Sequence, residues 1–76
     1  MNRETYNFDY AKLRGRIVEK AGTQKEFANA MGWSLATVSL KMTGKQQWKQ
    51  NEIALACSAL SIDPQDIGAY FFTRRV

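Results

Sequence analysis

Apolar residues recur along this chain at steps of three or four positions, the spacing that places them on one face of an α-helix. The first segment with this spacing has its apolar residues at Tyr10, Leu13, Ile17 and Ala21. We expect a helix here that starts after a cap at Asn7 or Asp9. Gly15 lies inside this helix, where glycine costs up to about 1 kcal/mol relative to alanine. It therefore predicts a close crossing with another helix.

A shorter helix is predicted after Gly22, which ends the first one. Thr23 is a capping residue and Glu26 stands three positions later, the capping-box pattern of a helix start. Gly32 ends this second helix, since glycine enters the left-handed region of backbone conformation at no steric cost.

A third helix follows almost at once. Ser34 can cap it, and Val38 and Met42 are four residues apart on one face. Gly44 closes it. Two helices this short, joined by so tight a turn, match a helix-turn-helix.

Two more helices complete the pattern. One is expected from Lys49 or Gln50 to Leu60, and Asp63-Pro64 starts the last, because aspartate caps and proline is favoured at the first helical position. No segment alternates apolar and polar residues for long enough to predict a strand. The predicted architecture is all-α, a compact unit of five short helices.

The length of 76 residues has room for a single domain, with residues 1–8 as a flexible N-terminus and 73–76 as a C-terminal tail. No apolar run approaches 18 residues, and the first ten residues lack the apolar segment of a signal peptide. A single cysteine, Cys57, cannot form an internal disulfide, and its place on an apolar helix face favours an inert thiol. These features predict a cytoplasmic protein.

The net charge of +4 is unevenly distributed. Residues 23–50, which include the predicted helix pair, carry four lysines and one glutamate. This concentration favours a nucleic-acid partner, and a merely solvated surface is the alternative.

Three patterns resemble the lambdoid repressor/Cro-like helix-turn-helix family: T-Q-x-E-F-A-x-x-M-G, V-S-x-x-M-x-G-K and I-A-x-A-x-x-A-L-S-I-D-P-x-x-I. Within that family, the G-A-Y-F-F ending is similar to small regulators of temperate bacteriophages of Gram-positive hosts. The resemblance spans about residues 7–72. It implies a lambda-repressor-like five-helix fold whose third helix enters the major groove of double-stranded operator DNA, commonly as a homodimer.

With Val38 and Met42 facing the core, the opposite face of the third helix is left for a partner. The residues expected to contact bases are Leu35, Ala36, Thr37, Ser39 and Leu40. The resemblance assigns base contact to Ala36 and Leu40, but both are apolar and could only contact a thymine methyl group. Leu35 could instead line the core, and Leu40 could be an ordinary exposed leucine.

Polar residues around this face are expected to hold DNA phosphates. They are Gln24, Lys25, Ser34, Lys41, Thr43, Lys45, Gln46 and Lys49. The resemblance assigns the phosphate contact at the start of the second helix to Gln24, and free backbone N–H groups favour an anion there. Helix capping or simple solvation are the alternatives for these side chains.

Aromatic residues supply two further expectations. Trp33 and Trp48 are expected to pack between helices, with contact to DNA as the alternative. Tyr70, Phe71 and Phe72 form a terminal cluster that could leave an apolar patch for a dimer or another partner.

Other chemistry is not predicted. The chain has no histidine, one cysteine and no glycine-rich phosphate loop, so we expect neither an enzyme nor a metal site, cofactor or small-molecule substrate. The leading hypothesis is a sequence-specific DNA-binding transcriptional regulator, such as a Cro-like repressor. The alternative is a protein-interaction module that uses the same fold to bind and modulate a repressor, because the third helix lacks long polar side chains that read bases.

Overall fold

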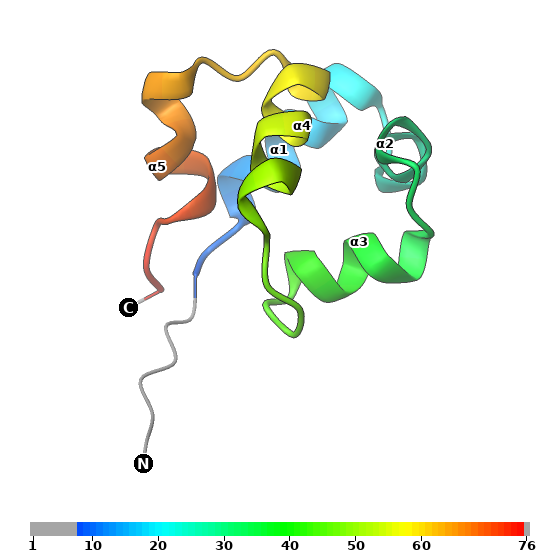
Figure 1. Cartoon of the computed structure of the whole chain (residues 1–76), viewed down its shortest axis with the longest axis horizontal. Helices are drawn as coiled ribbons and strands as arrows, with labels where there is room; N and C mark the ends of the chain where they lie inside the picture. Colours follow the sequence, from blue (N-terminus) through cyan, green and yellow to red (C-terminus); the bar gives the residue numbers. More distant parts are fainter. Residues whose placement is uncertain (1–7, 76) are drawn as a thin grey trace.

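A computed structural model describes residues 8–75 and shows an all-helical chain (Figure 1). Its helices are α1 (Ala11–Ala21), α2 (Gln24–Met31), α3 (Leu35–Met42), α4 (Gln50–Leu60) and α5 (Ile67–Phe71), with a 3-10 turn (Pro64–Asp66) before α5. The all-α prediction and the order of the five helices are confirmed. Over residues 8–75 no strand forms, apart from an isolated antiparallel bridge between Phe8 and Arg74. The prediction of a flexible N-terminus at residues 1–8 falls, apart from Phe8, outside the described residues, and so does the predicted cap at Asn7.

The helices α1 and α4 lie in the middle, with α5 on one side and the pair α2 and α3 on the other (Figure 1). All helices contribute to one apolar core, because each presents residues at the three-to-four spacing of its inner face. The buried core consists of Tyr10, Leu13, Ile17, Phe27, Ala28, Val38, Met42, Ile53, Ala56, Cys57, Leu60, Ile62 and Phe71. No helix in residues 8–75 has the length and apolar character needed to cross a membrane.

Side chains cap the helices where the sequence predicts it. The Asp9 carboxylate accepts a hydrogen bond from the Ala11 N–H at 2.8 Å, and Thr23 Oγ1 accepts one from the Glu26 N–H at 3.0 Å. These bonds satisfy N–H groups that have no partner inside the helix. Gly32 ends α2 with φ at +73°, in the left-handed conformation that glycine adopts most easily.

The end of α4 is held by a residue from α1. Arg16 donates from Nε to the Leu60 carbonyl at 2.9 Å and from Nη2 to the Ser61 carbonyl at 2.6 Å. Ser61 itself has a positive φ of 54°, which is unusual for a residue other than glycine. The arginine thus supplies donors to carbonyl groups that the helix end leaves unpaired.

The prediction for Gly15 is wrong. Beyond the neighbouring residues and the backbone of α1 itself, no atom lies within 4 Å of the position that a Cβ would occupy, so no helix crosses closely at this point. Gly15 lies on the exposed side of α1, opposite the buried Leu13 and Ile17.

Candidate interaction surface on the third helix

Helix α3 packs against the core on its inner face and is exposed to solvent on its outer face. Val38 and Met42 are buried in the core, and Ser34 Oγ caps the helix by accepting from the Thr37 N–H at 3.1 Å. On the outer face, Leu35 is 49% exposed and Leu40 is 42% exposed. The surface offered to a partner is therefore apolar at its centre.

Four of the five residues predicted to contact bases lie exposed, namely Leu35, Ala36, Ser39 and Leu40. Thr37 is half-buried, and its hydroxyl lies 3.1 Å from Ser34 Oγ. We name the exposed set Leu35, Ala36, Ser39 and Leu40 the outer face of α3. It can make van der Waals contacts and short hydrogen bonds from one hydroxyl, but it presents no long donor for a guanine or adenine edge.

The expectation that Lys41 binds phosphate is contradicted. The Lys41 residue is only 3% exposed, and its ammonium group points into the protein. It donates to Glu52 Oε1 at 2.8 Å and to the Gln47 carbonyl at 2.9 Å. Because a buried ammonium needs all of these partners, it is not available to a ligand.

Two aromatic rings complete the surroundings of this ammonium group. Lys41 Nζ lies 5.1 Å from the centre of the Trp33 ring and 5.9 Å from that of Trp48. Helical geometry alone places Lys41 beside Val38, at the edge of the core. Its burial depends on the ion pair with Glu52, eleven residues later in the chain. Sequence spacing does not show that these two side chains meet.

The carboxylate of Glu52 connects α3 with the loop that follows it and with the start of α4. Its Oε1 also accepts from the Lys49 N–H at 2.9 Å, at the start of α4. Burial alone would raise the pKa of Glu52, but the hydrogen bonds from Lys41 and from the Lys49 backbone, together with both positive charges, lower it overall. Glu52 is therefore a carboxylate in the folded protein at neutral pH.

The other predicted phosphate contacts vary in their availability. Exposed among them are Lys25, Ser34, Thr43, Lys45, Gln46 and Lys49, and Gln24 is half-buried. The Thr43 hydroxyl donates to the Ser39 carbonyl at 2.9 Å, so it serves the end of α3. Three lysines, Lys25, Lys45 and Lys49, are the exposed cations of this set.

Trp33 and Trp48 pack as predicted. The Trp33 ring lies 6.5 Å from Phe27 and 5.6 Å from Trp48, and the Trp48 ring lies 5.0 Å from Phe71 (centroid distances). These tilted and edge-to-face contacts connect the α2–α3 turn with the core beside α5. The Trp48 indole Nε1 is buried and has no hydrogen-bond partner in residues 8–75.

The terminal aromatic cluster divides between core and surface. Phe71 is 1% exposed, so its assignment to a partner interface is wrong: it completes the small core. Tyr70 is half-buried, with Lys12 Nζ 5.0 Å from its ring centre, and Phe72 is 51% exposed. A dimer through Tyr70 and Phe72 stays a prediction.

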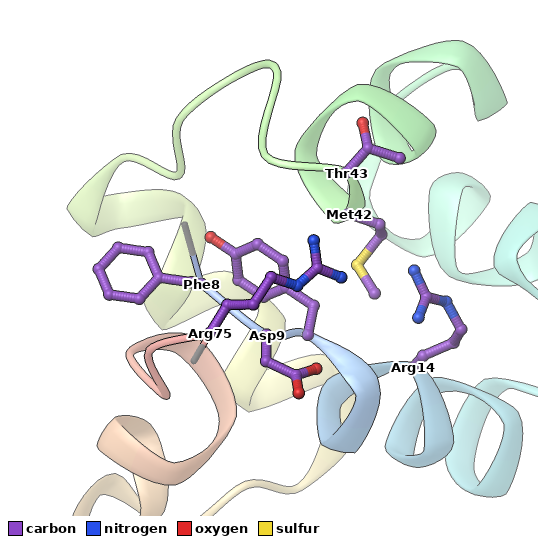
Figure 2. A pocket seen from close by; sticks show the side chains of 7 residues that line it. Phe8, Asp9, Arg14, Met42, Thr43 and Arg75 are labelled. Atoms are coloured by element: carbon purple, nitrogen blue, oxygen red, sulfur yellow. The ribbon is translucent and has the colours of Figure 1, made fainter. Parts of the chain in front are cut away.

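A pocket of about 150 Å³ lies where the start of α1, the end of α3 and the C-terminal segment meet (Figure 2). Its lining includes Tyr10 and Arg14 from α1 and its N-terminal boundary, Met42 from α3, and Arg75. The sequence did not predict this site, because its residues are separated by up to 67 positions and only the fold brings them together.

Comparison with known proteins gives a family and two similar structures. Residues 6–74 match the profile of a family described as a protein of unknown function, DUF739. No curated protein matches the chain. One similar structure is the solution structure of the modulator of repression (MOR) of the temperate bacteriophage TP901-1 from Lactococcus lactis. The two sequences are 53% identical, and the structures superpose with a TM-score of 0.78 over 87% of this chain and 89% of that one.

The crystal structure of the clp gene regulator ClgR from C. glutamicum is similar at a TM-score of 0.71, over 91% of this chain and 90% of that one. At 23% identity, this second likeness supports the fold alone. The MOR structure supports a regulatory role. The more specific lambdoid resemblance stays a prediction.

Proposed function

This chain belongs to the DUF739 family, and we propose that it is a regulator that modulates repression by binding a repressor protein through the outer face of α3. The observation that carries the proposal is the chemistry of that face. Leu35 and Leu40 are each more than 40% exposed, and the one lysine of α3 is buried in an ion pair. A protein partner can cover such a surface, whereas the edges of bases call for polar side chains.

The similarity to MOR supports this proposal independently. At 53% identity over most of both chains, the two proteins share more than a fold. MOR is a modulator of repression in a temperate bacteriophage, and we infer a role of the same kind for this chain in the cytoplasm of a bacterial host.

Sequence-specific binding to operator DNA is the second candidate. The observation that favours it is the placement of three exposed lysines, Lys25, Lys45 and Lys49, on the helices and loop next to α3. On this hypothesis α2 and α3 form the helix-turn-helix and α3 enters the major groove. Affinity would come from phosphate contacts, with little reading of sequence beyond methyl groups.

A binding assay with matched variants tests the proposal. The purified protein is titrated by calorimetry against the repressor proteins of the genome that encodes it. We expect Leu40→Asp to weaken the complex at least tenfold, which is about 1.4 kcal/mol, because it places a carboxylate in an apolar contact. Leu55→Asp is the control, since Leu55 is 56% exposed on α4 and is not part of the outer face of α3.

The same protein is then titrated with operator-region duplexes at several salt concentrations. A DNA-binding protein would show log affinity falling linearly with log salt, by about 0.9 per phosphate neutralised. Lys45→Ala would lower that slope by about one unit. Salt-dependent binding to duplex DNA, together with no repressor that binds, would overturn the proposal in favour of the second candidate.

A further inference from the structure

The pocket between α1, α3 and the C-terminal segment contains donors without partners. Arg14 and Arg75 both line it, and neither forms a hydrogen bond or an ion pair within residues 8–75. Figure 2 shows their guanidinium groups pointing toward one another across the pocket. Two positive groups that converge in this way repel each other, so an anion between them would be stabilised by both.

Tyr10 supplies a third donor. Tyr10 is only 8% exposed and lines the same pocket, and its hydroxyl has no hydrogen-bond partner in the described part of the chain. Among the buried polar side-chain atoms of residues 8–75, only Trp48 Nε1 lacks a partner, so the Tyr10 hydroxyl keeps some contact with solvent and can be reached by a ligand. The phenol is therefore a third group that can donate to a ligand bound in the pocket.

The acidic residue of the pocket does not neutralise these donors. The carboxylate of Asp9 accepts from the Ala11 N–H at 2.8 Å, and it forms no ion pair with Arg14 or Arg75. The Thr43 hydroxyl, on the rim, already donates to backbone carbonyls of α3. The groups left to donate to an anion are therefore two guanidiniums and one phenol.

We propose that this pocket binds the side-chain carboxylate of a glutamate presented by the protein partner. The volume of about 150 Å³ exceeds the space of a single water and can admit a side chain. The ring of Phe8 and the thioether of Met42 supply an apolar wall for the methylene groups of a glutamate stem. The arginines and Tyr10 then hold the carboxylate by charge-assisted hydrogen bonds.

The depth of the pocket favours a glutamate side chain over a nucleic-acid phosphate as its ligand. The lining residues Tyr10 and Met42 are only 8% and 4% exposed, so the floor of the pocket lies below the surface. A phosphodiester joined to sugars on both sides stays at the surface, whereas a glutamate side chain is narrow enough to enter. A free phosphate is an outcome that the test distinguishes.

The pocket is continuous with the outer face of α3, because Met42 and Thr43 form the end of that helix. A repressor that covers Leu40 would reach the pocket with a neighbouring segment. The inference rests on the proposed function for the identity of the partner, and it adds an acidic anchor to the apolar contact.

The test uses the whole protein and small probes. Glutamate capped at both ends by acetyl and amide groups carries one charge, on its side chain, and the capped glutamine is its neutral control. Each is titrated at constant ionic strength while amide and arginine Nε–H signals are followed by ¹⁵N NMR. We expect saturating shifts at Tyr10, Arg14 and Thr43 with the glutamate probe, and at least tenfold weaker binding of the glutamine probe.

Variants identify the donors. We expect Arg14→Gln and Arg75→Gln each to weaken the glutamate probe at least fivefold, and Tyr10→Phe at least threefold while keeping the buried ring. Lys20→Gln removes the same charge at the opposite end of α1 and is expected to change nothing. Circular dichroism of each variant checks that the fold is kept.

Three results would overturn the inference: no shifts at the pocket, equal binding of glutamate and glutamine probes, or tighter binding of inorganic phosphate than of glutamate. In the repressor assay, Arg14→Gln is expected to weaken the complex at least fivefold. If Leu40→Asp disrupts the complex and Arg14→Gln does not, the pocket inference fails and the proposed function stands. If no repressor binds at all, the proposed function fails, and the probe titration still decides whether the pocket takes a carboxylate.

Discussion

Removing the charge of Glu52 should strongly destabilise the protein. The side chain of Lys41 is 4% exposed and that of Glu52 16%, so Glu52→Gln would leave a buried ammonium group without its counter-charge. Breaking a buried ion pair from one side costs about 3–5 kcal/mol. We expect the lower end, about 3 kcal/mol, because the glutamine oxygen can still accept a hydrogen bond and the rings of Trp33 and Trp48 attract the cation.

This loss is large for a chain of 76 residues, whose free energy of unfolding should be about 4–11 kcal/mol. In urea, with a slope of about 1 kcal/mol per molar, the midpoint should fall by roughly 3 M. Circular dichroism at 222 nm (the helix signal) follows the transition. Glu19→Gln is the control: its carboxylate is 62% exposed beside Arg16, and its loss should cost about 0.5 kcal/mol or less.

A double-mutant cycle with Lys41→Met isolates the pair itself. The double variant should be more stable than the sum of the two single changes predicts, by about 2 kcal/mol, because no charge is then left unpaired. A cost of less than about 1 kcal/mol for Glu52→Gln, or additive single changes, would refute a buried and coupled pair.

The remaining predictions concern stability. Gly15→Ala should raise the free energy of unfolding, measured in urea, by about 0.5–1 kcal/mol. The reason is that alanine favours helix and its Cβ would meet no atom of another segment within 4 Å. A destabilised variant would contradict this. Arg16→Ala should cost about 1–2 kcal/mol in the same assay, since it removes two donors from the carbonyls that end α4, and an unchanged midpoint would show that water replaces them. Because the pKa of Glu52 lies below its ordinary 4.5 in the folded state, its contribution is present above about pH 4.5 and is lost as the pH falls through the lower folded value. Glu52→Gln should therefore flatten the loss of stability in acid, seen as a weaker pH dependence of the urea midpoint than in the unchanged protein.

The sequence predicted the helices well because the signals for them are local. Thr23, Gly32 and Ser34 act within a few residues of themselves, and the apolar spacing of α1 and α4 identifies the buried faces directly. Gly15 is the exception, since a glycine inside a helix can reflect a close crossing or no constraint at all, and only the neighbouring helices distinguish the two.

The site was predicted in part. Spacing alone located the outer face of α3, because Val38 and Met42 determine which side is buried. Helical spacing predicts Lys41 beside that face, and its burial depends on Glu52 and two tryptophans that the fold brings in from other segments. The arginine-lined pocket could not be predicted, since it joins residues from both ends of the chain through the pairing of Asp9 with Thr73.

The inward anchoring of α3 has a consequence for how this fold can diversify. Val38, Met42 and the Lys41–Glu52 pair hold the helix without help from Leu35, Ala36, Ser39 or Leu40. Substitutions on that outer side therefore cost little folding energy, and partner choice can change over evolution while the scaffold stays the same. A library that randomises these four positions should consequently contain mostly folded members, which makes the helix a suitable place to select new binding specificities.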